Sequence, residues 1–178
     1  PALDLGLSPA SAVENITDPI VGWDTETGYP AIGSEKYEGI ITLRRGVVSS
    51  LNVAAARTLL EDVSLQTGAD YLAKLGVDPS RIKTTGSGLA LGAMGITPIE
   101  MAGAYAAIAN EGKYIKPVSF SRVVDQNGKV ILDSSKLRTE QQVFKPTTAY
   151  MLVDILTEAV NSGTGTNAKI SGMTVAGK

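Results

Sequence analysis

The segment TPIEMAGAYAAIANEG, residues 97–112, limits the possible folds of this 178-residue chain most sharply. Thr97, Pro98 and Glu100 mark a helix start. A threonine N-cap, a proline at the first helical position and a glutamate at the third together satisfy the free N–H groups of the first turn. Residues 101–109 are apolar on nearly every side, and a helix of that kind is buried on most of its faces. The segment therefore predicts the central helix of a layered domain.

Other stretches carry helical patterns of ordinary amphipathic type. Ser8 and Pro9 predict a short helix near the N-terminus. The remaining predicted helices are residues 42–50 capped by Thr42, residues 52–63, residues 67–76 closed by Gly76, and residues 145–163. In the last of these, one side is expected to comprise Tyr150, Val153, Leu156, Thr157 and Val160.

Strand patterns follow the central helix. Residues 116–125 and 129–133 flank Gln126, Asn127 and Gly128, and Asn-Gly between two such runs is a strong hairpin signal. Residues 173–178 read as the beginning of a further strand, whereas residues 21–39 read as irregular chain. This order of elements along the chain (helices, a hairpin, a helix, then a strand) predicts an α+β fold in which a helical lobe packs against one antiparallel sheet.

Composition excludes several kinds of chemistry. The chain has no cysteine and no histidine, so disulfides, thiol nucleophiles, zinc ribbons and a Ser-His-Asp triad are impossible within it. The net charge is −2, which offers no basic field to a nucleic acid or an anionic membrane. No apolar run reaches the ~20 residues of a membrane span. We expect no nucleic-acid partner, no metal ion and no cofactor.

Three polar residues are candidates for a site. Ser50 and Asn52 lie between two predicted helices, where they could be a turn residue and a helix N-cap or could face a cleft. Lys178 follows Gly177 and could be simply solvated. Without histidine, however, serine and lysine are the components of a scheme in which an amine replaces imidazole as the base.

The chain resembles the transpeptidase domain of class A penicillin-binding proteins, whose motifs are S-x-x-K, S-x-N and K-T-G. Ser50 and Asn52 match the middle motif, and Lys178 matches the lysine of the third. The similarity extends through the segments 1–13, 37–59, 86–117 and 145–178. The resemblance implies a penicillin-binding transpeptidase or serine β-lactamase-like fold, with Ser50, Asn52 and Lys178 around one cleft between the helical lobe and the sheet.

The resemblance also implies a function. A serine of the first motif would attack the D-Ala-D-Ala bond of a peptidoglycan stem peptide, and an amine of a neighbouring stem would take over the acyl group. β-Lactams would be bound by the same site. Ser50 would relay a proton to the leaving nitrogen, Asn52 would hold the substrate backbone, and Lys178 would supply positive charge near the substrate carboxylate. All three are thus expected to be catalytic and substrate-binding.

The extent of the resemblance sets the expected domain boundaries. Ser80, which has a lysine three residues later, follows the middle motif instead of preceding it, so we reject it as the nucleophile. We expect residues 1–178 to be a partial transpeptidase domain, with the nucleophile helix and the strands after K-T-G on complementary fragments of the same protein. The parent protein is expected at the extracytoplasmic face of the bacterial membrane, anchored by a segment outside this chain.

Two alternatives stay open at the sequence level. A β-lactamase-like hydrolase or a penicillin-binding sensor shares the motifs. A non-catalytic binding module could keep the same fold without the chemistry. The stretch GITPIEMAGAYAAIANEG resembles the synthetic enzymes more closely, which favours the transpeptidase.

Overall fold

The computed structural model describes residues 1–23, 30 and 37–178, so most of the irregular chain predicted over residues 21–39 lies outside the described residues. The helices are α1 (Leu43–Val48), α2 (Asn52–Arg57), the π-helix η1 (Thr58–Val63), α3 (Leu65–Lys74), the 3-10 helix η2 (Pro79–Arg81), α4 (Gly86–Ala90), α5 (Pro98–Ala109), α6 (Ser134–Leu137), α7 (Pro146–Ser162) and the 3-10 helix η3 (Thr166–Ala168). The strands are β1 (Ala12–Asn15), β2 (Gly39–Thr42), β3 (Lys113–Ile115), β4 (Arg122–Val124), β5 (Val130–Asp133) and β6 (Glu140–Gln142).

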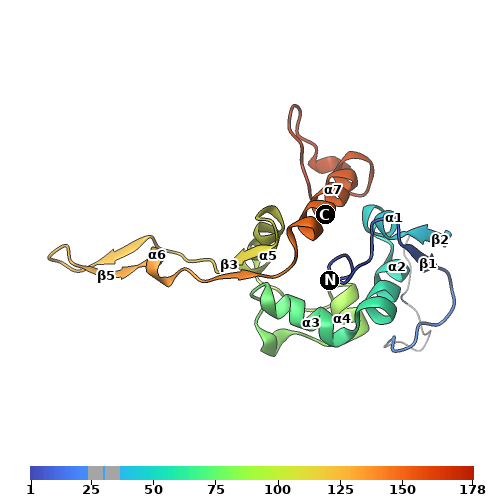
Figure 1. Ribbon diagram of the computed structural model, residues 1–178, viewed down its shortest axis with the longest axis horizontal. Helices are drawn as coiled ribbons and strands as arrows, with labels where there is room; N and C mark the ends of the chain where they lie inside the picture. The colour runs from blue at the N-terminus through green and yellow to red at the C-terminus, as the bar shows by residue number, and fades with distance from the viewer. Residues whose placement is uncertain (24–29, 31–36) are drawn as a thin grey trace.

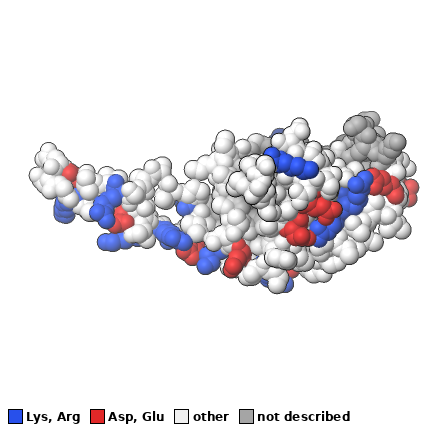
Figure 2. All heavy atoms as spheres, turned by 90° about the horizontal axis from the view of Figure 1, so that it is seen from above, with Lys and Arg blue, Asp and Glu red and all other residues white. Residues whose placement is uncertain are grey.

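The longer helices form one body, from which a β-arm projects. Figure 1 shows α1 to α5 and α7 grouped around the N-terminus, with the C-terminus beside α7. The strands β4 and β5, together with α6, extend away from this body as a narrow arm. Both signs of charge are distributed along the arm and the helical body (Figure 2).

Several predicted helix ends are confirmed. The Thr42 side chain accepts a hydrogen bond from the Arg45 N–H at the start of α1. At the start of α5, Thr97 and Glu100 make the reciprocal bonds of a capping box. Gly76 ends α3 in the left-handed region, with φ of 88°, a conformation that glycine adopts at little cost.

The hairpin predicted around Asn127 and Gly128 is also confirmed. The strands β4 and β5 are antiparallel, with Val123 opposite Leu132 and a bulge before Val124. Gly128 has a φ of 80°, the positive value that a tight hairpin turn requires.

The prediction of one antiparallel sheet was wrong in detail. The described residues form three separate two-stranded antiparallel pairs, β1 with β2, β3 with β6, and β4 with β5. The α+β class is correct, but the helices pack on one another more than on a sheet.

Two local predictions were also wrong. Residues around Ser8 and Pro9 form a turn, and the strand β1 follows it. In this strand the side chains of Val13 and Asn15 are buried, and the strand pairs with β2. Residues 173–178 form no strand. The backbone N–H of Gly177 instead donates to the Leu156 carbonyl of α7 at 3.3 Å, so the segment is held by a helix.

The burial of α5 is lower than its composition suggests. Gly103 and Ala107 are buried, but Ile99 is 57% exposed and Met101 is 45% exposed. The described elements therefore cover only one side of this helix, and its prediction as a helix buried on most faces was wrong.

The buried face of α7 is shifted from the predicted one. Leu156 and Val160 are buried as expected, whereas Tyr150 is 76% exposed. The other buried residues of this helix are Thr148, Ala149, Ile155 and Ala159.

A carboxylate from the other end of the chain caps α7. The helix has no side-chain cap of its own, and the first N–H groups of a helix need acceptors. Asp4 accepts hydrogen bonds from the Lys145 N–H at 2.8 Å and from the Thr148 hydroxyl at 2.9 Å. Tyr71 of α3 donates to the same carboxylate at 2.5 Å. Asp4 thus ties the N-terminal segment to α3 and α7.

Candidate functional site

Ser50 lies two residues beyond α1, in a turn that two backbone hydrogen bonds fix. The Ser50 N–H donates to the Val47 carbonyl at 3.2 Å, and the Leu51 N–H donates to the Gly46 carbonyl at 2.9 Å. This pair of bonds is the Schellman pattern of a helix C-terminus, in which the residue at the position of Ser50 is left-handed and is most often glycine. Ser50 has a φ of 59°, so it adopts the left-handed conformation despite its β-carbon.

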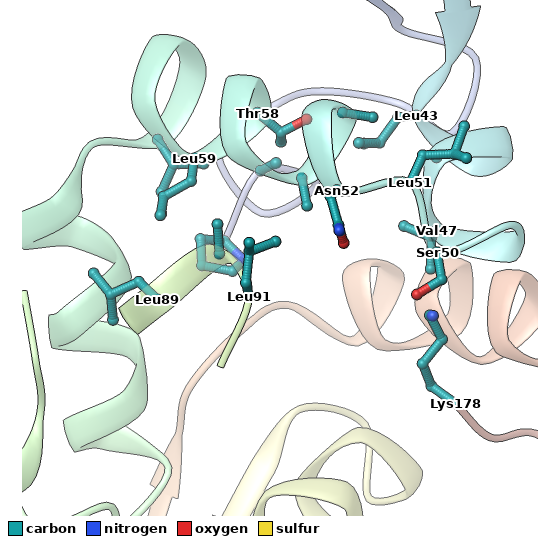
Figure 3. Close-up of a pocket in the computed structure, with 17 residues that line it drawn as sticks. Leu43, Val47, Ser50, Leu51, Asn52, Thr58, Leu59, Leu89, Leu91 and Lys178 are labelled. Carbon is teal, nitrogen blue, oxygen red and sulfur yellow. The ribbon is translucent and has the colours of Figure 1, made fainter. Parts of the chain in front are cut away.

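Asn52 begins the next helix. Leu51 occupies the N-cap position of α2 and makes no side-chain capping bond. The interpretation of Asn52 as the helix N-cap is therefore wrong, since it is the first helical residue. Figure 3 shows the Asn52 amide directed into a pocket that Ser50 also lines.

Lys178 reaches the same pocket from the opposite side. The bond from the Gly177 N–H to the Leu156 carbonyl holds its backbone on α7. In Figure 3 the Ser50 hydroxyl and the Lys178 amine point toward one another. Partial burial lowers the pKa of Lys178 from its ordinary value of 10.5, because desolvation disfavours the charged amine.

The pocket has a volume of about 400 Å³ and mostly apolar walls. Its apolar lining includes Leu43, Val47, Leu51, Leu59, Leu89 and Leu91. Among the described residues that line it, Lys178 is the one with a charged side chain. A few polar groups converging in an apolar cleft are typical of a small-molecule site. Here they could hold a peptide carbonyl and a carboxylate.

The structure thus brings Ser50, Asn52 and Lys178 to one pocket. The pocket lies between helices and the C-terminal segment and has no β-strand residue in its lining. The expected location between a helical lobe and a sheet was therefore wrong for the described residues. An adjoining apolar pocket of about 480 Å³ also reaches Lys178.

Thr58 is a pocket residue that no sequence motif marks. Thr58 begins η1, lines the pocket, and has a buried hydroxyl without a hydrogen-bond partner among the described residues. Thr58 is the first residue of a π-helix, and π-helical turns are often found at functional sites. No residue pattern distinguishes a π-turn from ordinary helix, so the sequence offered no signal for it.

Ser80 lies outside the pocket. Its hydroxyl donates to the carboxylate of Asp78, the N-cap of η2, at 2.8 Å. This contact closes a local turn. The described residues contain no group of three or more histidine, cysteine, aspartate or glutamate side chains that could hold a metal ion. None of the helices they form is long and apolar enough to cross a membrane.

Family comparison agrees with this arrangement. Residues 14–178 match the family described as the penicillin binding protein transpeptidase domain. The chain belongs to this family, whose proteins take part in peptidoglycan synthesis.

Its curated relatives include 1A-type, class A penicillin-binding proteins. The chain is 34% identical to penicillin-binding protein 1A of Clostridium tetani over 88% of this chain and 21% of that protein. It is 31% identical to penicillin-binding protein 1A of Clostridium perfringens over 100% of this chain and 28% of that protein. The chain therefore spans less than a third of the length of these relatives.

Solved structures show the same fold. Penicillin-binding protein 1A of Haemophilus influenzae matches 99% of this chain and 29% of that chain, with a TM-score of 0.73 and 24% identity. A penicillin-binding protein A from M. tuberculosis, described as an imipenem acyl-enzyme complex, matches 98% of this chain and 44% of that chain, with a TM-score of 0.72 and 18% identity. At these identities, the structures establish the fold alone.

Proposed function

We propose that this chain is the part of a peptidoglycan D,D-transpeptidase that faces the substrate, and that the whole enzyme cross-links stem peptides through a serine acyl-enzyme and binds β-lactams. The observation that supports the proposal most strongly is the convergence of Ser50, Asn52 and Lys178 on one apolar pocket. The family match supports it independently. The nucleophilic serine and its lysine base would lie on polypeptide outside these residues.

In this proposal, Ser50 moves a proton. The nucleophilic serine adds to the carbonyl between two D-alanines, and the C–N bond then breaks. The leaving nitrogen needs a proton, which a hydroxyl can pass on because it both donates and accepts. The Ser50 hydroxyl is directed into the pocket and toward Lys178, as this role requires.

Lys178 and Asn52 hold the substrate. The Lys178 ammonium would attract the terminal carboxylate of a stem peptide or of a β-lactam, an attraction that strengthens where water is excluded. The apolar walls around Lys178 provide such surroundings. The Asn52 amide would donate to a backbone carbonyl of the substrate and fix its direction.

Because the chain covers a minor part of its relatives, the setting of the enzyme is also a proposal. We place the whole protein at the extracytoplasmic face of the bacterial membrane, with the anchor outside these residues. The substrates, stem peptides ending in D-Ala-D-Ala, belong to the cell wall on that side. Complementary segments of the same protein would complete the domain.

Labelling with a fluorescent penicillin tests the proposal. The intact protein should form a covalent adduct that survives a denaturing gel, and both Ser50→Ala and Lys178→Ala should slow its formation. Ser80→Ala is the matched control and should label at the wild-type rate. Failure of the intact protein to label, or full labelling of both site variants, would contradict the proposal.

The fate of the adduct separates the alternatives. A transpeptidase should pass the acyl group of a stem-peptide substrate to an added amine and give a cross-linked product. Release of the free acid alone would indicate a hydrolase. Stable labelling without either product would indicate a sensor. A polypeptide of these 178 residues should not label, because its one S-x-x-K pattern lies at Ser80.

A further inference from the structure

The last turns of α1 and α7 touch each other beside the pocket. The carbonyls in the last turn of a helix lack partners within the helix, and Val48 contributes one of them. The Thr164 N–H, two residues beyond α7, donates to the Val48 carbonyl at 3.3 Å. The two helix ends are therefore joined by a backbone hydrogen bond only two residues before Ser50.

Gly163 makes this approach possible. A β-carbon at position 163 would overlap the Val48 carbonyl oxygen and would lie 2.8 Å from Val48 Cγ1. The φ of Gly163 is −100°, outside the left-handed region that favours glycine. Close contact with Val48, and with the Ala159 carbonyl oxygen of α7 at 2.9 Å, therefore favours glycine at this position.

We propose that Gly163 is a positioning residue that sets the separation of Ser50 and Lys178, an inference that rests on the proposed function. Lys178 is held on α7 through the bond between Gly177 and Leu156. Ser50 is held on α1 by its left-handed turn. The distance between α1 and α7 at Gly163 therefore fixes how the two side chains face one another.

The other end of α1 is attached to α7 as well. Arg44 forms ion pairs with Asp154 at 2.5 Å and with Glu158 at 2.8 Å. A methyl group at position 163 would push away the end of α1 near Val48 while these ion pairs hold its start. The helix would pivot, and the displacement would be largest at Ser50.

Penicillin acylation of the intact protein tests the inference. Gly163→Ala should lower the acylation rate at saturating penicillin by about tenfold or more, since a displacement of about 1 Å in a site can cost 10²-fold. The dissociation constant of the first, non-covalent complex should change less. Gly95→Ala is the matched control, because a β-carbon there meets nothing within 4 Å.

A second control separates positioning from loss of stability. Val143 is buried in a different cluster, with Phe144 and Ala149, so Val143→Ala should lower the melting temperature without moving Ser50. At equal fractions of folded protein, this variant should acylate at the wild-type rate. A wild-type acylation rate in Gly163→Ala, or equal slowing in Val143→Ala, would overturn the inference.

Amide hydrogen exchange tests the contact without any use of activity. The Thr164 N–H should be protected in the wild-type protein and should exchange faster in Gly163→Ala, while Gly95→Ala leaves it unchanged. Unaltered protection in Gly163→Ala would overturn the inference. If the wild-type protein does not react with penicillin, the proposed function fails, whereas the Thr164 exchange still decides whether Gly163 holds the two helices together.

Discussion

The ends of α1 and α3 have the same backbone design but different residues. At the end of α3, the Gly76 N–H donates to the Ala73 carbonyl at 3.0 Å. The Val77 N–H donates to the Leu72 carbonyl at 3.1 Å. In α1, Ser50 occupies the position that corresponds to Gly76, and the N–H groups of Ser50 and Leu51 make the equivalent bonds to the Val47 and Gly46 carbonyls. Both residues are left-handed, with φ of 88° for Gly76 and 59° for Ser50.

The difference follows the surroundings of the two turns. Gly76 packs against Tyr114, whose hydroxyl a β-carbon would overlap, so its role is structural. Ser50 lines the pocket, where a glycine would offer no hydroxyl. A left-handed residue with a β-carbon costs about 1–2 kcal/mol. Ser64 and Glu111 also have positive φ among the described residues but do not line the pocket, so the strain at Ser50 does not by itself mark a functional site. Under the proposed function, the hydroxyl that Ser50 places in the pocket is what the α1 turn gains from a serine instead of a glycine.

Removing the Ser50 hydroxyl is the sharpest test of this comparison. Ser50→Ala keeps the β-carbon and hence the backbone strain, so the free energy of unfolding should change little. If Ser50 relays a proton, acylation of the intact protein by penicillin should slow by about 10²–10⁴-fold. Urea titration and labelling kinetics measure the two effects. A large loss of stability without a loss of rate would break the comparison.

Adding a β-carbon to the α3 turn should have the opposite outcome. Gly76→Ala introduces left-handed strain and an overlap with Tyr114, which together should lower the free energy of unfolding by about 2–4 kcal/mol. The acylation rate per folded molecule should stay near the wild-type value. Gly95→Ala, in open space, is the control. A stable Gly76→Ala protein would show that the two turns differ less than the structure indicates.

The start of α7 extends the comparison to a helix end capped by a distant residue. Asp4→Ala removes the cap and should lower the free energy of unfolding by about 0.5–2 kcal/mol at neutral pH. Partial burial acts to raise the pKa of Asp4, but hydrogen bonds from Tyr71, Lys145 and Thr148 outweigh it, and the pKa is lowered below 3.8.

The lowered pKa gives this prediction a pH signature. A carboxylate whose pKa is lower in the folded state than in the unfolded state stabilises the protein at any pH above its unfolded-state pKa. This stabilisation is lost as the pH falls through the folded-state pKa. The stability difference between wild type and Asp4→Ala should thus be full at neutral pH and shrink below about pH 4. Urea midpoints across this range measure it. A difference independent of pH would contradict the capping role.

The smallest expected effect is a gain in stability, in the variant Ser50→Gly. Ser50→Gly relieves the left-handed strain and should raise the free energy of unfolding by about 0.5–1 kcal/mol. Acylation should nevertheless fall as far as in Ser50→Ala, because both variants lack the hydroxyl. Thermal melts at equal concentration measure the gain. Loss of stability in Ser50→Gly would show that the Ser50 side chain stabilises the turn, contrary to our account.

Much of the local structure could be predicted because its signals are local. The capping box of Thr97 and Glu100, the turn at Gly128 and the glycine end of α3 depend on residues within one or two turns of chain. The candidate site residues could also be predicted from the sequence. Ser50, Asn52 and Lys178 match short motifs that lie within long segments similar to the transpeptidase family. Their shared pocket agrees with the motif pattern, while their roles stay predictions.

The remainder depends on long-range contacts that periodicity does not encode. Asp4 caps α7 from more than a hundred residues away, so the attachment of the N-terminal segment could not be predicted from local pattern. The exposure of Ile99 and Met101 depends on which elements lie beside α5, and apolar composition alone does not specify them. Likewise, the contact between Gly163 and Val48 becomes visible only when α1 and α7 are placed side by side.

A crystal structure of the intact protein acylated by a penicillin tests the central claim most directly. Our account predicts the acyl group in the pocket described here, with Ser50 and Asn52 within hydrogen-bond distance of it and the Lys178 ammonium beside the penicillin carboxylate. An acyl-enzyme whose bound penicillin contacts none of Ser50, Asn52 and Lys178 would contradict it.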